Sequence, residues 1–501
     1  MSTPAKTAIS PIDHDWIDAL TADFPADRAN RVARNSVTSA NVDAAARNVS
    51  TMRTYHDTFS VSLPKTGDVT NQRQSGRCWM FSTYNVVRAE TMRLLDVDNF
   101  EFSQVFGMFY DKLEKFNAGL GYILDTVELP LSSREVSLVM EDQMSDGGYW
   151  NFATSVIAKW GLVPKDAMPE NACSKSSAEM NRQLERLFRK SALELRRMAE
   201  AGAGADELLV AKDQMVAACH KVLSTCLGEP PVTFDLEVAV GKDCRAKHGT
   251  IVEQGGDREK DAAEGGVGTC PDAENGDKDE KPRRVLVDRG ITPREFVERY
   301  VPFDPEGYVT LDCMPGDTRP FDTLYHLELT DNMVGGIPTN VLNVRQEQLE
   351  DAAVASLKAG YPCQMSCDVM QSFARHIDDF PGVLATDTMD YEALFGVDLA
   401  MERADMIDTR ETWLTHAMTF QGVQLGEDGR PTAWRIENSW GKDACKDGYL
   451  VASAEWFALY GGEVVVRREF VPTELLAIWD AGDAVSVMPW DGMSAANPRR
   501  A

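Results

Sequence analysis

The pattern of apolar residues changes along this chain, and the change limits the folds open to it. Residues 178–226 repeat apolar side chains at helical spacing and are interrupted only at GAGAD, which predicts a helical hairpin. The final third carries short strand-like runs at 416–424 and 432–438, on either side of the turn signal GEDGRP. Helices early and neighbouring antiparallel strands late indicate an α+β architecture.

The length of the chain predicts more than one compact unit. Its 501 residues exceed the roughly 250–300 at which one hydrophobic core stops growing, so we expect one large elaborated domain or two to three lobes. No apolar run reaches the about 18 residues that a membrane span needs, and the first residues lack the basic start and apolar stretch of a secretory signal. We therefore expect a cytoplasmic protein.

Charge and cysteine content exclude several classes of partner. A formal net charge of −28 repels phosphate backbones and anionic membranes, so we expect neither nucleic acid nor a membrane as partner. Ten cysteines without a C-x-x-C pair are too sparse for a disulfide scaffold. Cys363 and Cys367, in CQMSC, are more simply core thiols than half of a zinc site, and we expect no metal.

Residues 241–284 differ in composition from the rest of the chain. They contain eight glycines and no aromatic residue. Because such a segment cannot bury enough apolar surface to fold by itself, we expect a disordered acidic, glycine-rich insertion. His248, Cys244 and Cys270 lie inside it, and we expect no specific role for them.

One cysteine stands in a setting that suits a nucleophile. In NQRQSGRCWMFS, Cys78 follows a QSG turn and opens a segment without Pro or Gly, which predicts a helix with Cys78 in its first turn. A thiol attacks only as its thiolate, and the positive end of a helix dipole favours that charge. A buried structural cysteine is the commoner reading of Cys78 taken alone.

A nucleophilic cysteine needs a histidine as general base, and His416 is the best placed of the seven. It opens a predicted strand flanked by apolar residues, whereas His220 lies on the hairpin and His14 and His56 in a polar N-terminal segment. Asn438, in ENSWG, can accept a hydrogen bond from the imidazole and fix its orientation. Trp440 can cover that bond against water.

Amide hydrolysis also needs donors aimed at the oxyanion. Gln72 lies far enough before Cys78 for its amide to fold back over the thiol, with Gly76 supplying the turn, and the Cys78 backbone N–H would be the second donor. Gln74 is too close, and we interpret it as a loop residue. The order of Gln, Cys-Trp, His and Asn-Ser-Trp-Gly favours a nucleophilic Cys78 over a structural one.

At these residues the sequence resembles the papain-like cysteine peptidases, and within them the bleomycin hydrolase and aminopeptidase C branch. The resemblance covers nearly the whole chain except 241–284. It implies a papain-like α+β fold, with a helical lobe, an antiparallel β-barrel-like lobe and a large helical insertion. It also implies catalysis without a cofactor. The matching segments are VTNQRQSGRCWMFS, SDGGYWNFATSVIAKWGLVPKDAMPE, WLTHAMTFQGV, WRIENSWG and MPWDGMSAA.

The resemblance implies roles for individual residues. Gly147 and Gly148 match a glycine pair whose backbone pairs with the substrate chain, which glycine permits because it has no side chain. The branch forms hexamers with active sites facing an internal cavity, so a homohexamer acting on peptides is expected. The roles of nucleophile, acid–base, orienter and oxyanion donor are assigned to Cys78, His416, Asn438 and Gln72.

The C-terminal tail departs from the branch. There the terminal carboxylate lies in the active-site cleft and holds the substrate's α-ammonium, which makes the enzyme an aminopeptidase. Here that carboxylate belongs to Ala501, and the neighbouring Arg499 and Arg500 would repel an ammonium. The tail is trimmed, or it loops out, or N-terminal selectivity is altered.

These interpretations give an expected order of segments along the chain. They are an N-terminal arm at 1–60, a helical lobe with the nucleophile at 61–175, a helical hairpin insertion at 176–235, the disordered insertion at 241–284, the remaining core and the β lobe with the histidine and asparagine at 285–480, and a tail in the cleft at 481–501.

Three hypotheses of function follow. The first is a cytoplasmic cysteine aminopeptidase that removes N-terminal residues through a thioester. The second is a cysteine endopeptidase or broader amide hydrolase, with relaxed N-terminal selectivity because of the extended tail. The third is a non-catalytic scaffold with a relic site, against which the intact set of four residues argues.

Overall fold

The computed structural model describes residues 11–254, 283–373 and 382–496. The expectations for Cys270, Arg499, Arg500 and Ala501 fall outside the described residues. No helix within these ranges is long and apolar enough to cross a membrane.

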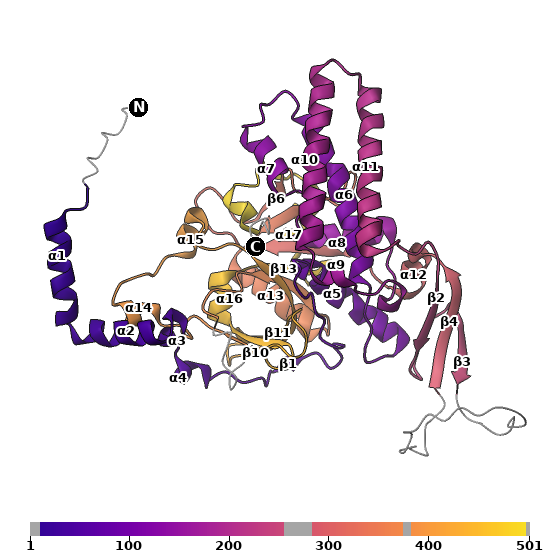
Figure 1. Cartoon of the computed structure of the whole chain (residues 1–501). Coiled ribbons are helices and arrows are strands. Elements are labelled where there is room, and N and C mark those ends of the chain that lie inside the picture. Colours follow the sequence, from indigo (N-terminus) through magenta and orange to yellow (C-terminus); the bar gives the residue numbers. More distant parts are fainter. Residues whose placement is uncertain (1–10, 255–282, 374–381, 497–501) are drawn as a thin grey trace, which may run out of the picture.

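Helices make up most of the first half of the chain (Figure 1). Helix α5, Cys78–Leu95, begins at the cysteine, as predicted. The helices that follow it before the hairpin are α6 (Gln104–Asp125), α7 (Arg134–Asp142), α8 (Trp150–Trp160) and α9 (Ala172–Lys175).

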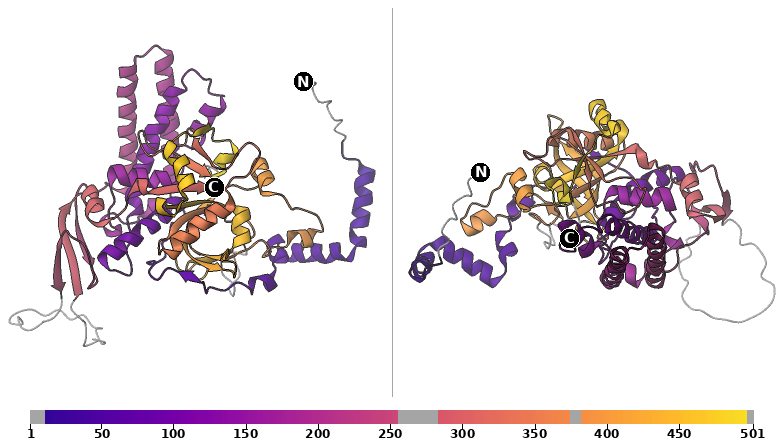
Figure 2. Two further views of the ribbon diagram at one scale, coloured as in Figure 1. Left: turned by 180° about the vertical axis from the view of Figure 1, so that it is seen from behind. Right: turned by 90° about the horizontal axis from the view of Figure 1, so that it is seen from above.

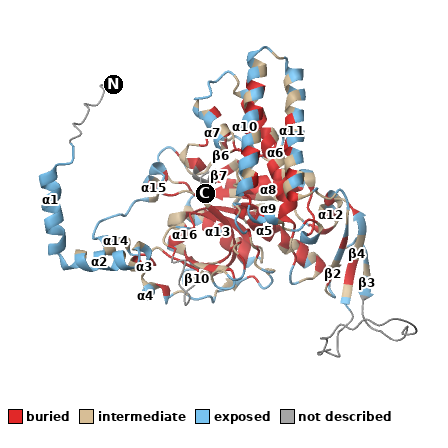
Figure 3. Ribbon diagram, viewed as in Figure 1, coloured by how far each residue is buried: buried red, intermediate tan, exposed pale blue. Residues whose placement is uncertain are grey.

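The predicted helical hairpin is confirmed as α10 (Ala178–Glu200) and α11 (Ala205–Leu227). The two helices stand side by side above the rest of the molecule in Figure 1. Leu184, Phe188 and Leu195 form the buried stripe of α10 and pack with Phe116 of α6. Figure 3 shows that burial on the inward side, while the outer sides are exposed.

A mixed sheet dominates the second half of the chain. Among the described residues, eleven strands form it in the order β14-β6-β7-β5-β13-β8-β10-β11-β12-β9, with β1 pairing β10. The neighbouring antiparallel strands predicted late in the chain are confirmed, because β10 pairs β11 antiparallel. The strands are β1 (Val61–Ser62), β5 (Tyr308–Asp312), β6 (Thr323–Leu327), β7 (Asn340–Asn343), β8 (Cys363–Cys367), β9 (Val383–Leu384), β10 (His416–Leu425), β11 (Pro431–Glu437), β12 (Tyr449–Ser453), β13 (Gly461–Arg467) and β14 (Val485–Val487).

Helices cover both faces of this sheet. Met418 and Phe420 of β10 pack with Leu349 of helix α13 (Gln346–Lys358) in one apolar cluster. Ala417, which points to the other face because successive strand residues alternate, packs in the cluster of Cys78. Cys363 and Cys367 of β8 are buried, as expected for core thiols.

Polar contacts tie α5 to the sheet along its whole length. Ser82 Oγ donates to the Met418 carbonyl at 2.6 Å, and Thr83 Oγ1 donates to Gln364 Oε1 at 2.9 Å. Near the far end of the helix, Arg88 Nη2 lies 2.6 Å from Glu437 Oε1, and both side chains are buried. Breaking one partner of such a pair leaves an uncompensated buried charge, so these contacts fix where α5 lies.

The prediction that 241–284 is disordered is wrong for residues 241–254. In a second, three-stranded sheet, β3 (Thr250–Gln254) and β2 (Phe234–Ala239) pair antiparallel with β4 (Arg283–Ile291). Ile251 of β3 packs against Leu286 of β4 in the apolar cluster of Cys78. Averaging composition over the whole segment hid this strand, whose partner β4 supplies the apolar surface. Residues 255–282 lie outside the described part.

The N-terminal segment leaves the body of the protein as an extended arm (Figure 2). Neither α1 (His14–Asp23) nor α2 (Arg28–Ser39) has a buried residue. The arm returns to the body through α3 (Val42–Ala46) and α4 (Val49–Met52), and Met52 packs with Val383 of β9.

The last described residues pack on the main body of the protein. After helix α17 (Thr473–Ala481), β14 pairs parallel with β6, and Met493 is buried in the apolar cluster that contains Cys78. The remaining helices are α12 (Pro293–Tyr300), α14 (Tyr391–Phe395), α15 (Arg403–Thr409) and α16 (Ala454–Tyr460), and the 3-10 turns are Phe24–Ala26, Lys165–Ala167, Pro305–Gly307, Arg468–Phe470 and Gly492–Ala496.

Candidate active site

Cys78 is the first residue of α5, and its side chain is buried at 7% exposure. Burial is the largest influence on the thiol and raises its pKa above the ordinary cysteine value. The backbone N–H groups of Ala417, Trp79 and Cys78 itself act in the opposite direction. The helix start alone therefore does not hold this sulfur as a thiolate, and a positive partner is needed.

His416 and Asn438 meet because of the β10–β11 register. Thr419 pairs with Glu437, so the start of β10 lies beside the end of β11. His416 Nε2 lies 2.8 Å from Asn438 Oδ1, which also accepts from the Ser439 N–H at 2.7 Å. Because an amide oxygen can only accept, Nε2 carries the proton and Nδ1 is the nitrogen that can take one.

Trp440 covers the imidazole, as the sequence suggested. The ring centroids of His416 and Trp440 are 5.1 Å apart at 32°, and Phe373 stacks on Trp440 at 6.2 Å. An aromatic layer of this kind limits water around the His416–Asn438 bond and strengthens it.

The thiol and the histidine are brought together through Ala417. Its N–H points to the Cys78 sulfur, and it is the residue after His416 on β10. Cys78 and His416 therefore lie near each other where the helical half meets the sheet, although they are far apart in sequence.

Gln72 lies beside Asn438, while Gln74 does not. The Gln72 N–H donates to the Ser439 carbonyl at 2.7 Å, and Ser439 Oγ donates to Gln72 Oε1 at 2.6 Å. Gln72 Nε2 donates one hydrogen to the Ser75 carbonyl at 2.6 Å, and its second hydrogen can serve another acceptor. Gln74 instead pairs with Lys175, on the other side of the loop.

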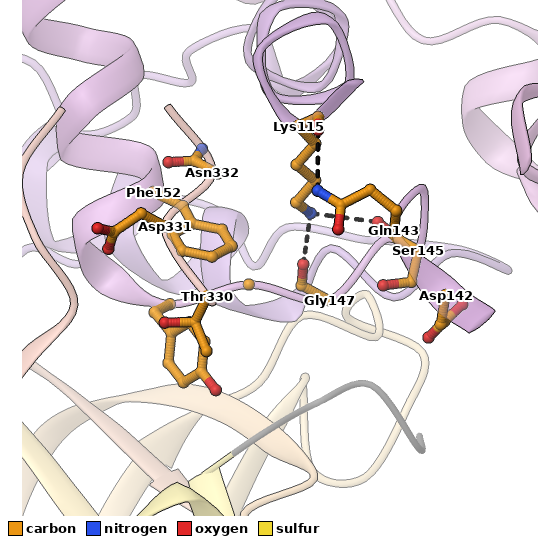
Figure 4. Close-up of a pocket in the computed structure, with 11 residues that line it drawn as sticks. Lys115, Asp142, Gln143, Ser145, Gly147, Phe152, Thr330, Asp331 and Asn332 are labelled. Atoms are coloured by element: carbon orange, nitrogen blue, oxygen red, sulfur yellow. Dashed lines mark hydrogen bonds between the residues drawn. The ribbon is translucent and has the colours of Figure 1, made fainter. Parts of the chain in front are cut away.

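The glycine pair lies in the loop between α7 and α8. A Cβ at Gly148 would lie 2.5 Å from Trp79 Cε2, so packing on the residue next to the nucleophile requires glycine there. Lys115 Nζ donates to the Gly147 carbonyl at 2.6 Å, as Figure 4 shows. No hydrogen bond of the Gly148 backbone is found among the described residues.

Several residues around the site were missed by the sequence analysis. Arg77 forms two 3.0 Å bonds to Glu170 and anchors the turn before Cys78. Asp146 accepts from the Gly76 N–H at 3.1 Å. The only hint in the sequence that Asp146 lies near the site is its position directly before the glycine pair. Lys112 and Lys115 gave none, because lysines on a helix usually point to water.

Ala501, expected to bind the substrate's amine, lies outside the described residues. No cluster of three or more His, Cys, Asp or Glu side chains that could hold a metal ion is present in residues 11–254, 283–373 and 382–496.

Comparison with known proteins gives consistent matches along nearly the whole chain. The model of the Peptidase C1-like family matches residues 11–250 and 271–494. Aminopeptidase C of Lactobacillus delbrueckii subsp. lactis is 31% identical over 486 residues, covering 97% of this chain and 98% of the relative. Aminopeptidase W of the same organism is 33% identical over 477 residues, covering 95% and 98%.

A solved structure agrees with these sequence matches. The crystal structure of PepW from Lactobacillus rhamnosis HN001 superposes with a TM-score of 0.85 at 32% identity, covering 97% of this chain and 99% of that one. The helices and mixed sheet are thus those of a papain-like fold, and the resemblance read from the sequence is confirmed. The chain therefore belongs to the Peptidase C1-like family and is a cysteine peptidase of the aminopeptidase type.

Proposed function

We propose that Cys78, His416, Asn438 and Gln72 form the catalytic set with which this aminopeptidase removes N-terminal residues from peptides. One observation carries the assignment. The 2.8 Å bond between His416 and Asn438 places the ring proton on Nε2 and makes Nδ1 the basic nitrogen, and the next N–H on the same strand, that of Ala417, points at the Cys78 sulfur.

The reaction begins with proton transfer from the Cys78 thiol to His416 Nδ1. Burial raises the pKa of the thiol, so the thiolate forms only together with the imidazolium that stabilises it. The sulfur then attacks the scissile carbonyl carbon. The resulting oxyanion accepts from the Cys78 N–H and from the second hydrogen of Gln72 Nε2.

Collapse of this intermediate breaks the C–N bond, and His416 gives its proton to the leaving amine. The N-terminal residue remains on Cys78 as a thioester. Water then attacks the thioester, with His416 taking the water proton, and the amino acid leaves as the thiol is restored. Asn438 keeps the ring oriented through both proton transfers, and Trp440 shields their bond.

Replacing Cys78 by Ser should lower kcat/KM for aminoacyl coumarin substrates by at least about 10³-fold, because an alcohol does not form the anion next to His416. Fluorescence release at neutral pH measures this. Cys173→Ser, at a half-buried cysteine of α9, serves as matched control and should retain wild-type activity. Full activity of the Cys78→Ser variant would remove Cys78 from the mechanism.

We propose that the chain's own C-terminal carboxylate, at Ala501 or at a trimmed end, holds the α-ammonium of the substrate. Support comes from the path of the described tail, whose Met493 is buried in the apolar cluster of Cys78. The competing reading is an endopeptidase or broader amide hydrolase, favoured by Arg499 and Arg500 beside the terminus.

The mature C-terminus can be defined by intact mass, and the full chain compared with a chain ending at Ala496. A carboxylate that pairs with the ammonium should make free-amine peptides better substrates than their N-acetylated forms by about 100-fold, since such a pair is strong in a partly dry cleft. Equal rates for the two peptides, in both chains, would favour the endopeptidase.

We also propose a homohexamer with active sites facing an internal cavity. The arm supports this, because Trp16, Phe24 and Val32 are 57%, 45% and 59% exposed, and large apolar side chains on a projecting arm suit burial against another copy. We further propose that the strands late in the chain form the barrel-like lobe of the papain-like fold, and that the hairpin of α10 and α11 is the family's helical insertion. The cytoplasmic location stays a prediction.

Light scattering of the full chain should give about six times its 55.4 kDa mass. Deletion of residues 1–40 should lower the mass of the assembly, because the exposed apolar surface of α1 and α2 is lost. A monomer at micromolar concentration would contradict the hexamer.

A further inference from the structure

Four charged side chains are buried next to the glycine pair. Lys112 Nζ lies 2.8 Å from Asp146 Oδ1, and Lys115 Nζ lies 2.9 Å from Asp111 Oδ2. All four are at most 8% exposed. Removing charges from water is costly, and hydrophobic residues of similar size would often stabilise a fold as well. A positional role is therefore a better account of this cluster than stability.

Asp146 touches both sides of the nucleophile. Its Oδ2 accepts from the N–H of Gly76, and its backbone carbonyl accepts from Trp79 Nε1 at 2.7 Å. These two residues lie just before and just after Cys78. A Cβ at Gly76 would lie 3.1 Å from the Asp146 Cβ, so the two loops are in close contact.

The same loop is held from behind by α6. Lys112 Nζ donates to the Met144 carbonyl, and Lys115 Nζ donates to the carbonyls of Ser145 and Gly147 at 3.1 and 2.6 Å. Figure 4 shows Lys115 reaching down to this loop at the edge of a pocket lined by both glycines. Asp146 is thus the link between the α6 lysines and the turn that carries Cys78.

We propose that Asp146 is a positioning residue for the peptidase reaction, which holds the substrate-pairing glycines at a fixed distance from the nucleophile. The inference rests on the proposed roles of Cys78 and of the glycine pair. Asp146 touches no reacting atom. It acts through Gly76 and Trp79 on one side and through the adjoining Gly147 on the other.

The charge of Asp146 adds a second effect. Burial alone would raise the pKa of its carboxyl, but Lys112 and the side chains of Ser177 and Asn181 hold it well below the usual range. Asp146 is therefore ionised at working pH, and its charge raises the pKa of the Cys78 thiol. Cys367 of β8 also interacts electrostatically with the thiol, and the proposed base His416 opens the strand β10 that packs on α5.

Two variants separate the positioning effect from the charge effect. In Asp146→Asn the amide oxygen stays with the donors Lys112 and Asn181, so the bond from the Gly76 N–H is lost together with the negative charge. The double variant Asp146→Leu/Lys112→Met removes both charges and every side-chain acceptor for the Gly76 N–H, so the net charge near the thiol is unchanged while the positioning bond stays lost. Glu114→Gln is the control, because the buried Glu114 of α6 pairs with Lys159 and Trp160 of α8 and, among the described residues, makes no hydrogen bond or ion pair with this loop.

Both variants should raise KM for aminoacyl coumarins about tenfold, the value of one charge-assisted hydrogen bond. In Asp146→Asn the acid limb of the pH profile for alkylation of Cys78 by iodoacetamide should move to lower pH, because loss of a nearby negative charge lowers the pKa of the thiol. In the double variant the limb should return toward wild type while KM stays high. Glu114→Gln should keep both wild-type values.

Wild-type KM and an unmoved acid limb in folded Asp146→Asn would overturn the proposal. If circular dichroism shows that this variant does not fold, the double variant decides, and its wild-type KM would overturn the proposal equally. Failure of the proposed function is distinguishable, because the wild-type chain would then not hydrolyse aminoacyl coumarins at all.

Discussion

The packing of helix α5 on strand β10 is the contact on which the rest of the site depends. It places the Cys78 sulfur at the Ala417 N–H, beside His416, and it is held in register by Ser82 on the Met418 carbonyl. The buried pair of Arg88 and Glu437 secures the other end of the helix. Since Glu437 is the residue before Asn438, the same ion pair links α5 to the segment that carries Asn438.

Burial is the dominant influence on the Cys78 thiol. Burial raises the pKa of Cys78, so the resting thiol stays neutral unless an imidazolium forms beside it. The His416–Asn438 bond under Trp440 fixes the ring for that exchange. Charge is balanced beside Gly147 and Gly148 as well, where Lys112 and Lys115 are each paired with an aspartate.

Local rules were enough to predict the parts of the site that depend on one segment. Helix α5 begins at Cys78 because a Gly-containing turn precedes a run without Pro or Gly, and β10 and β11 flank a turn signal. Gln72 was preferred over Gln74 by its distance from the cysteine alone, and the structure places Gln72 beside Ser439. The roles assigned to these residues remain predictions.

Features that depend on partners far away in sequence were not accessible in this way. Strand β3 exists because β4 pairs with it across residues 255–282, and averaged composition could not reveal that partner. The lysines of α6 looked like surface residues until Asp146 and Asp111 were found against them. The pKa of Cys78 was also expected to be lowered by the helix, whereas burial raises it, and burial is a property of the assembled lobes.

The central claim is that the contact between α5 and β10 makes one thiol, Cys78, reactive through His416. Peptide mass mapping after brief iodoacetamide treatment at about pH 6, where an ordinary thiol is almost fully protonated, tests it directly. The account predicts that Cys78 alone among the ten cysteines is alkylated in the folded protein, and that His416→Ala abolishes the labelling. Even labelling of several cysteines, or unchanged labelling of Cys78 in His416→Ala, would contradict it.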